Sequence, residues 1–559
     1  MNRPLRATPT RSTPARDAVP PLSAALLDPA CYPHPVSGVR VLETHISWVL
    51  LTGEYAYKIK KPVNLGFVDF TTLALRRHYC EEELRLNRRL APGLYLEVVS
   101  IRGDPGAPRI GGEGPVLDYA VKMREFPQEA LASRRIAGGG FGAAEIDALA
   151  ALVAEFHAGA PAAGPAGRFG APDAVLSAAL QNFEQMLPLV KTASEDRTLR
   201  TLRRWTEREH GARRDGFERR RREGFVRECH GDLHLGNITM IGSRPVPFDC
   251  IEFNDDLRWI DVMSEVAFLA MDLEDRGRRD LAWRFLNRTL EATGDYAGIP
   301  VLRFYLVYRA LVRAKVHLMR SRQPRLQRGE KMRLSRAFHD YLRLAARYAA
   351  PDRAALLITH GLSGCGKTTA TQPLVELLGA VRLRSDLERK RLHGVPPRSS
   401  SGSGLASGIY TKEAGAATYR RLGELAWEVL RAGFSVVVDA VLLKRPERDA
   451  FRAIAERFEA PFLILDFHAP LPVLRARITE RLARADDASE ADLAVLERQL
   501  AAREPLTPAE MAVAFAVDAT RPVSHDLWRP VIERLRRSAA GTASRPPARA
   551  ARPDDETIT

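Results

Sequence analysis

The sequence has few cysteines and no long apolar run, and each absence excludes a class of protein. Its five cysteines form no CxxC pair, so we expect neither a disulfide framework nor a zinc site, and a reducing, cytoplasmic location fits best. No apolar stretch approaches the roughly 20 residues of a transmembrane helix, and no membrane contact is expected. Residues 1–21 lack the apolar segment of a secretory signal and are predicted to form a disordered tail.

A nucleic-acid motif is also absent, although the chain is basic. There are 84 Lys and Arg residues against 69 Asp and Glu, a formal net charge of +15, and such an excess can indicate a nucleic-acid partner. Here, however, arginine is spread along the whole chain. The one dense run, residues 213–222, is typical of a solvated helix face. We therefore expect small-molecule ligands and no nucleic-acid partner.

The 559 residues are too many for one compact core, and their patterns divide into two parts. Residues 39–126 contain strand-like runs and one helix, and helical spacing dominates residues 144–348. Together they indicate an α+β domain over residues 22–350. After a break at residues 351–353, strands alternate with helices, which is typical of an α/β domain with a parallel sheet, predicted over residues 351–537.

Individual elements can be placed within these parts. In the first part we expect a helix at Arg76–Leu90 and strands at Ile46–Leu51, Tyr55–Lys60 and Asp118–Met123. In the second part the alternation predicts elements at residues 355–359, 367–378, 381–384, 417–432, 435–438 and 462–467. A Gly- and Ser-rich insertion at 396–408 is predicted to be a mobile loop, and residues 538–559 a disordered tail.

The strongest motif is GLSGCGKT at residues 361–368, which satisfies the P-loop pattern G-x4-G-K-S/T. An apolar strand precedes it and a helical segment follows, as a P-loop requires. Its glycines allow backbone N–H groups to point at phosphate oxygens, and the residues concerned are Gly361, Gly364 and Gly366. Lys367 is predicted to bridge the β- and γ-phosphates of ATP, and Thr368 to hold Mg²⁺.

Further residues of the second part fit the same chemistry. An apolar strand ends at Asp439, which is the position of a metal-side carboxylate, although an Asp that caps an ordinary strand is the alternative. Asp386 follows the second strand of this part and is predicted to orient or deprotonate an acceptor hydroxyl, or else to cap a helix. Arg477, Arg481 and Arg484 share one helix face, which suits either a phosphate-clamping lid or a solvated surface.

The first part contains HGDLHLGN at residues 230–237, which has the H-x-D-x4-N frame of kinase catalytic loops. In that frame Asp232 reaches the acceptor hydroxyl and Asn237 ligates Mg²⁺ on the phosphates. After a predicted hairpin, Asp249 supplies a second metal carboxylate. The sequence therefore predicts a second nucleotide site, separate from the P-loop.

This string is the hallmark of the aminoglycoside phosphotransferase family, which the first part resembles. The resemblance implies a protein-kinase-like fold, with ATP and Mg²⁺ as cofactors. It places Lys60 on the α- and β-phosphates, with Lys58 on the same strand face as the alternative. It also makes Glu83 the ion-pair partner of that lysine, in competition with Glu81 and Glu82, and makes Asp261 either a brace for the catalytic loop or a helix cap. The G-x-G-x-x-G loop of protein kinases is absent, and residues 44–47 stand in its place.

The second part resembles P-loop small-molecule kinases such as gluconate and shikimate kinases, and AAA-labelled ATP-binding domains. The whole arrangement is similar to bacterial bifunctional aminoglycoside phosphotransferase/ATP-binding proteins. This resemblance implies that each domain transfers the γ-phosphate of ATP to a hydroxyl of a small molecule. Two alternatives remain: a regulatory pair, in which the kinase-like domain binds nucleotide and gates the other domain or a partner, and a P-loop ATPase that drives a conformational change.

Overall fold

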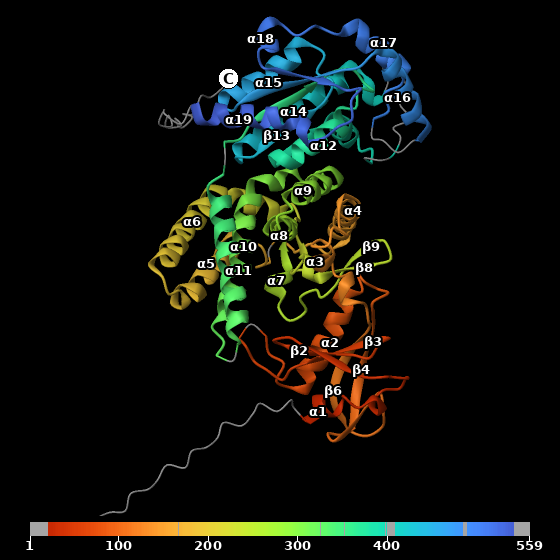
Figure 1. Cartoon of the computed structure of the whole chain (residues 1–559), viewed down its shortest axis with the longest axis vertical. Coiled ribbons are helices and arrows are strands. Elements are labelled where there is room, and N and C mark those ends of the chain that lie inside the picture. Colours follow the sequence, from red (N-terminus) through yellow and green to blue (C-terminus); the bar gives the residue numbers. More distant parts are fainter. Residues whose placement is uncertain are drawn as a thin grey trace, which may run out of the picture.

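The computed structural model describes residues 21–541, apart from residues 67, 166, 325, 352, 397, 398, 400–407 and 485–488. The chain is elongated, with a strand-rich end, a helical middle and a second sheet-containing part arranged along its long axis (Figure 1). The predicted tails up to residue 20 and from residue 542, and most of the predicted loop at 396–408, lie outside the described residues. Helix α19 (Arg529–Gly541) continues past the tail boundary predicted at residue 538.

The strand-rich end is an antiparallel six-stranded sheet with the order β1-β2-β3-β6-β4-β5. Its strands are β1 (Arg40–Glu43), β2 (Ser47–Leu51), β3 (Tyr55–Lys60), β4 (Tyr95–Asp104), β5 (Ala107–Ile110) and β6 (Val116–Arg124). Helix α2 (Leu73–Asn87) packs against β4 and β6, and its first turn is capped by the hydroxyl of Thr72, which accepts from the backbone of Leu75. The predicted hairpin is present, because β2 pairs with β3 across a turn in which Gly53 has a φ of +99°.

The middle part is helical. Its main helices are α4 (Ala143–Gly159), α5 (Pro172–Met186), α6 (Ala193–Arg222), α8 (Val262–Asp275), α9 (Arg279–Thr293), α10 (Ile299–Ser321) and α11 (Arg328–Ala349). Two short antiparallel pairs flank the catalytic loop: β7 (Val226–Glu228) with β10 (Trp259–Asp261), and β8 (Ile238–Ile241) with β9 (Arg244–Pro247). None of the helices in the described part of the chain is both long and apolar enough to cross a membrane.

One arginine of the basic run at 213–222 departs from the predicted solvated face. Arg220, near the end of α6, has a fully buried side chain. Its guanidinium donates to both carboxylate oxygens of Asp261 at 2.7 and 2.8 Å and to both of Asp295 at 2.6 and 2.8 Å. A buried charge is tolerated when it is paired in this way, so Arg220 ties α6 to β10 and to the end of α9.

The last part is an α/β unit with a parallel five-stranded sheet in the order β12-β13-β11-β14-β15. Its strands are β11 (Leu356–His360), β12 (Ala380–Arg384), β13 (Ser435–Asp439), β14 (Phe462–His468) and β15 (Ala514–Asp518). The helices include α12 (Lys367–Leu378), α13 (Ser385–Leu392), α14 (Lys412–Arg431), α15 (Arg445–Arg457), α16 (Leu471–Arg484) and α17 (Leu493–Ala502). The central strand β11 is buried throughout, as a parallel strand covered on both faces should be.

The helical middle packs directly on the P-loop part through α9, which lies against α12 and the edge strand β12. The side-chain amide of Asn287 donates to the carbonyl of Ala380 at 2.9 Å and accepts from the backbone N–H of Arg382 at 2.7 Å. The ring of Trp283 meets that of Phe434 with 5.9 Å between centroids. One apolar cluster therefore continues from the helical middle into the second sheet.

Candidate functional sites

The catalytic loop brings Asp232 and Asn237 together. The side-chain amide of Asn237 donates to Oδ2 of Asp232 at 2.9 Å and to the Asp232 carbonyl at 3.1 Å. Nε2 of His234 lies 3.4 Å from the same Oδ2, and the Asp232 side chain is 37% exposed. The loop therefore presents to solvent a carboxylate that is fixed by the side-chain amide of Asn237.

Asp249 is held next to this loop by the β8–β9 hairpin. The backbone N–H of Phe248 donates to the Asn237 carbonyl at 2.9 Å, and the ring of His230 bonds the Phe248 carbonyl at 2.8 Å. Asp249 itself has a φ of +66°, and its N–H donates to the hydroxyl of Tyr95 at 3.1 Å. A left-handed non-glycine residue is strained, and such strain concentrates at functional sites. The geometry thus places three oxygen-bearing side chains, Asp232, Asn237 and Asp249, around one hairpin.

The two candidate lysines of β3 occupy different depths. Nζ of Lys58 donates to Glu83 Oε1 at 2.7 Å and to Asp249 Oδ1 at 2.5 Å. Nζ of Lys60 donates to Glu83 Oε2 at 2.8 Å and to the carboxylate of Glu252, and its side chain is fully buried. Glu83 is therefore the shared partner among the three predicted glutamates. Of the two lysines, Lys58 is the one that borders Asp249.

This buried charge cluster favours the ionised forms of Glu83 and Lys58. Burial opposes ionisation of Glu83, but Lys58 and Lys60 outweigh it and lower its pKa to about 2. Burial would likewise lower the pKa of Lys58, yet Asp249 and Glu83 hold it well above its ordinary value. Burial raises the pKa of Glu252, against the opposing effect of Lys60. The Lys58 ammonium is thus retained at the edge of the cleft.

Glu265 of α8, rather than Asp261, braces the catalytic loop. Oε1 of Glu265 accepts the N–H of Gly231 at 2.7 Å, and Oε2 bonds His157 of α4 at 2.8 Å. Asp261 accepts the N–H of Met263 at 2.8 Å, which is the helix-cap alternative, and pairs with Arg220. Gly231 is required here, because its φ is +87° and an added Cβ would lie 2.8 Å from the carbonyl oxygen of Leu257.

A metal at this brace is not supported, although His157, Cys229 and Glu265 bring ligand atoms within 4.8 Å of one another. Both Glu265 oxygens already accept hydrogen bonds, and the thiol of Cys229 lies 3.6 Å from the carbonyl of Ile260. Burial and the Glu265 carboxylate hold the pKa of Cys229 well above its ordinary value. A protonated thiol is a poor metal ligand, so the trio is a hydrogen-bonded support.

The three predicted glycines of the P-loop adopt left-handed backbone conformations. Gly361, Gly364 and Gly366 all have positive φ, at +142°, +83° and +72°. A Cβ on Gly364 would lie 2.9 Å from the carbonyl of Leu474, so only glycine fits there. Nζ of Lys367 donates to the carbonyls of Gly361 and Leu362 at 3.0 and 2.9 Å. The lysine thus lies along the inside of the loop.

Thr368 and Asp439 meet at the start of α12. The Thr368 hydroxyl donates to Oδ2 of Asp439 at 2.6 Å. Asp439 ends β13, and Thr368 is the second residue of α12, so the pairing joins two elements 71 residues apart. Hydroxyl and carboxylate oxygens at the end of a parallel strand are ligands that Mg²⁺ prefers.

Of the predicted acceptor carboxylate and lid arginines, Arg477 is the one whose position beside the P-loop follows from the described contacts. Asp386 is the second residue of α13, beyond its N-cap, so the capping alternative does not apply; it pairs with Arg389 at 3.7 Å. Arg477 donates to the carbonyl of Ala519 at 2.8 Å, and a Cβ on Gly366 would lie 3.8 Å from its Nη1. Arg481 instead bonds the carbonyl of Ala491. The side chain of Arg484 lies outside the described residues.

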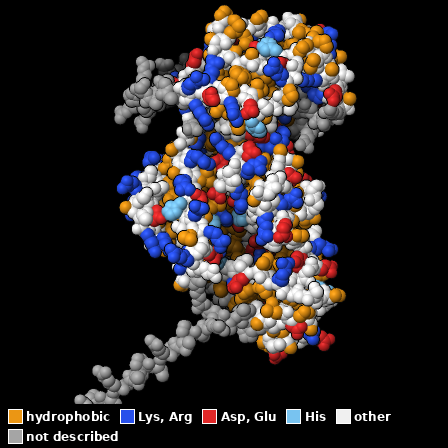
Figure 2. Space-filling view, viewed as in Figure 1, with side chains coloured by type: hydrophobic (Ala, Val, Ile, Leu, Met, Phe, Trp, Pro, Cys, Tyr) orange, Lys and Arg blue, Asp and Glu red, His pale blue; other side chains and the backbone are white. Residues whose placement is uncertain are grey.

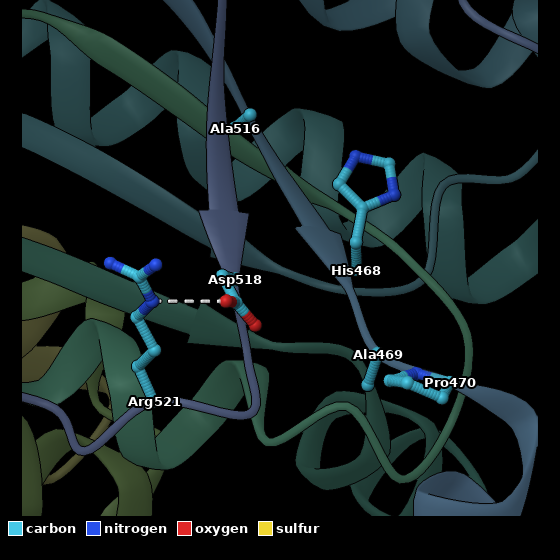
Figure 3. Close-up of a pocket in the computed structure, with 6 residues that line it drawn as sticks. All are labelled: His468, Ala469, Pro470, Ala516, Asp518 and Arg521. Carbon is cyan, nitrogen blue, oxygen red and sulfur yellow. Dashed lines mark hydrogen bonds and ion pairs between the residues drawn. The ribbon is translucent and has the colours of Figure 1, made fainter.

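The sequence analysis did not predict a histidine–aspartate–histidine hydrogen-bond network beside the P-loop. Asp466 of β14 bonds Nδ1 of His360 and Nε2 of His468, both at 2.6 Å. His360 is fully buried, and His468 lines a cavity of about 530 Å³ at the carboxyl ends of β14 and β15 (Figure 3). In that view Asp518 and Arg521 form an ion pair on the opposite wall, at 3.1 Å. Ligands of open α/β sheets bind at such strand ends.

Comparison with known proteins gives similarity over most of the chain. Residues 356–506 match the AAA domain family. An uncharacterized protein of Mycobacterium tuberculosis, Rv2004c, is 30% identical over 514 residues, which cover 90% of this chain and 99% of that protein. Two solved structures also align: a gluconokinase from Sinorhizobium meliloti (23% identity, 34% of this chain and 97% of that one, TM-score 0.25) and a choline/ethanolamine kinase family protein from Mesorhizobium loti (14%, 56% and 94%, 0.33).

Proposed function

The chain belongs to the family of the mycobacterial protein Rv2004c, and on this premise we propose that it is an ATP-dependent phosphotransferase with two sites. Each site would bind Mg-ATP and transfer its γ-phosphate to a hydroxyl of a small molecule. The first site lies in a protein-kinase-like domain over residues 22–350, and the second in a P-loop domain over residues 351–537. The observation that carries the proposal is that the chain brings polar side chains together at two separate places, Asp232 with Asn237 and Thr368 with Asp439.

In the first site the phosphate contact is assigned to Lys58, replacing the earlier expectation of Lys60. Lys58 borders the 42%-exposed carboxylate of Asp249, whereas Lys60 is enclosed between Glu83 and Glu252. A lysine without exposed surface has no route to a phosphate. Glu83 then holds Lys58 in place, as the ion-pair partner of a kinase lysine does.

Asn237 and Asp249 fit a Mg²⁺ ion in the first site, because amide and carboxylate oxygens are its preferred protein ligands. When bound, Mg²⁺ would neutralise charge on the phosphate oxygens. Asp232 accepts the hydrogen bond of the acceptor hydroxyl and takes its proton as transfer proceeds. The acceptor oxygen forms a bond to the γ-phosphorus, and the bond from that phosphorus to the bridging oxygen breaks, with the electron pair leaving on ADP.

The ionisation of Asp232 suits this role. Burial would raise its pKa, but His234, Arg313 and His230 hold it well below its ordinary value. Asp232 is therefore a carboxylate at every physiological pH, able to accept the hydroxyl hydrogen bond. Because the transition state of phosphoryl transfer is loose, orientation of the acceptor contributes more than early proton removal.

In the second site the backbone N–H groups of the P-loop and Lys367 would hold the phosphates, and Thr368 and Asp439 the metal. Asp386 is the proposed acceptor-side carboxylate. The lysine has room to do this, since its present partners are only backbone carbonyls and the Cys365 sulfur. Arg477, beside Gly366, is the candidate lid arginine.

The test is ADP release measured with and without a panel of hydroxylated acceptors, on the full chain. Asp232→Asn should abolish acceptor-dependent release from the first site, and Lys367→Ala from the second, while the double variant should release none. An unchanged acceptor-dependent rate in Asp232→Asn would reduce the first domain to a nucleotide-binding regulator.

A further inference from the structure

A row of basic side chains on α10 leads away from the catalytic loop. Arg313, His317 and Arg320 are spaced at i, i+4 and i+7, so they share one face of the helix. We call these three residues the basic row. Nη1 of Arg313 lies 3.5 Å from Nε2 of His234, and that same nitrogen lies 3.4 Å from the Asp232 carboxylate. The row therefore begins at the acceptor-orienting carboxylate.

The charges of the basic row act on ionisable groups at each end of it. At one end, Arg313 reaches the Asp232 carboxylate through the ring of His234. Burial together with Arg313 and Arg320 lowers the pKa of His317 to about 4, so this histidine is neutral at pH 7. Burial, Arg320 and Lys61 lower the pKa of His45, which lies at the turn between β1 and β2. Arg320, at the far end of the row, is therefore close enough to this turn for its charge to act on His45.

Each member of the row has a buried nitrogen without a partner. These are Nε of Arg313, Nδ1 of His317 and Nε of Arg320. A buried donor without an acceptor costs roughly 1–3 kcal/mol, so such atoms call for an explanation. One acceptor of the same region, Oδ1 of Asp272, is also unpartnered. Two of these unpartnered atoms, the Nε atoms of Arg313 and Arg320, are obligate donors, which an acceptor-rich ligand satisfies.

Two carboxylates beside the row, Asp272 and Glu330, already have hydrogen-bond or ion-pair partners. Oδ2 of Asp272 accepts from the N–H of Leu235 at 3.0 Å and from Arg276 at 3.3 Å. Glu330 of α11 pairs with Arg320 at 3.4 Å, which is long for a charge-assisted bond and leaves Nε free. Burial, together with the charges of Asp272 and Asp340, raises the pKa of Asp275 on α8, so this neighbouring carboxyl is a weak partner for an ammonium group.

The cleft itself is visible on the surface. Figure 2 shows a hollow between the strand-rich end and the helical middle, with histidine and Lys or Arg side chains at its rim. From Arg313 to Arg320 the helix rises about 10 Å at 1.5 Å per residue. A molecule that reaches from Asp232 to Arg320 is therefore about the size of a phosphorylated or oxidised hexose.

We propose that the acceptor of the first site is a hydroxyl compound with an anionic group, a carboxylate or a phosphate, bound by the basic row. Its hydroxyl lies at Asp232, and its anion is held by the guanidinium groups of Arg313 and Arg320. His317 contributes a neutral hydrogen bond between them. This inference rests on the proposed phosphotransfer, and it selects against the cationic acceptors that the family resemblance suggests.

The test uses the Lys367→Ala protein saturated with AMP-PNP. The substitution disables the P-loop site, and the nucleotide fills the first site. Inorganic sulfate and four hexoses of graded charge are titrated by calorimetry: glucose 6-phosphate, gluconate, glucose and glucosamine. Affinity should rise with negative charge, and Arg320→Gln should weaken binding of sulfate and of the anionic sugars at least tenfold. The matched control Lys331→Gln removes one positive charge on neighbouring α11 and should leave binding unchanged.

Two outcomes overturn the inference: no anion binds in an Arg320-dependent way, or glucosamine binds more tightly than gluconate. The same sugars are then supplied with ATP, and ADP release is measured. Anions that bind through the row without any phosphate transfer would refute the proposed function and leave the binding inference standing. Transfer to glucosamine and not to the anionic sugars would support the proposed function and refute the binding inference. Circular dichroism of Arg320→Gln checks that the variant is folded.

Discussion

At the residue scale, Lys58 and Lys60 illustrate what the sequence can and cannot predict. The two-residue period of a strand correctly places both on one face. It contains no information on depth, which follows from Glu252, a residue about 190 positions away, closing over Lys60. The residues of the contiguous loop were easier to place, because Asp232 and Asn237 belong to one short motif. Glu265 was missed, since a single glutamate in a helical pattern carries no such signal.

The two lysines should respond differently to removal of their charge. Lys58→Met should weaken AMP-PNP binding at the first site at least tenfold with little loss of stability, because Lys58 lies at the cleft. Lys60→Met leaves Glu252 buried without its partner, which costs roughly 3–5 kcal/mol, and should mainly destabilise the fold. Calorimetric titration and urea unfolding of both variants distinguish these effects. Strong nucleotide binding by Lys58→Met together with its loss in a folded Lys60→Met would return the phosphate role to Lys60.

At the element scale, complete strand–loop–helix units were predictable and irregular strands were not. Strand β11 and helix α12 were predicted because they flank a P-loop, and β13 because an apolar run ends in Asp439; the structure confirms all three. Strand β4 was missed for a physical reason: its pairing with β6 shifts register between Tyr95 and Glu97, so the alternation of buried and exposed residues is interrupted. Strand β15 was missed because it is a short edge strand with only one buried residue, Val517.

Helix α10 should make stability depend on pH. His317 is surrounded by Arg313 and Arg320 on its own helix, Tyr341 on α11 and Asp272 on α8. Its pKa is lowered to about 4 in the folded protein, whereas the unfolded chain takes up the proton near pH 6.5. Between these values the unfolded state binds more protons, so the free energy of unfolding falls as pH is lowered from about 6.5 to 4.

Substitution isolates this contribution. His317→Gln should remove part of the decline in unfolding free energy between pH 7 and pH 4.5, measured by urea titration. His393→Gln, at an exposed position, should not alter it. If both variants retain the full pH dependence of the parent protein, the lowered pKa assigned to His317 is wrong.

At the scale of the whole molecule, a buried carboxylate is one of the links between the two parts. Glu291 of α9 accepts from Nε and Nη2 of Arg382 at 2.9 and 2.6 Å. The same guanidinium donates from Nη1 to the Thr368 carbonyl at 3.1 Å. A carboxylate of the kinase-like part therefore orients a residue of the P-loop site. This connection is the observation that favours communication between the sites. Sequence alone gave no sign of it, because it joins residues 91 positions apart on an ordinary helix and an edge strand.

Loss of this carboxylate should weaken nucleotide binding at the second site. Glu291→Gln leaves Arg382 buried without a charged partner, and we expect about tenfold weaker AMP-PNP binding at the P-loop, with the first site unaffected. Glu376→Gln is the matched control at the same contact, because its partner Arg284 keeps Asp147 at 2.6 Å. Binding at the P-loop is measured by calorimetry in a Lys58→Met background, and binding at the first site in a Lys367→Ala background. Equal effects of the two substitutions would mean that the interface acts only through general stability.

The account rests on two independent nucleotide-binding sites in one chain. The most direct test counts AMP-PNP molecules bound per chain by calorimetry in the presence of Mg²⁺. Two are expected for the parent protein, one for Lys367→Ala, one for Asp249→Ala and none for the double variant. A parent protein that binds a single nucleotide at saturation would contradict it.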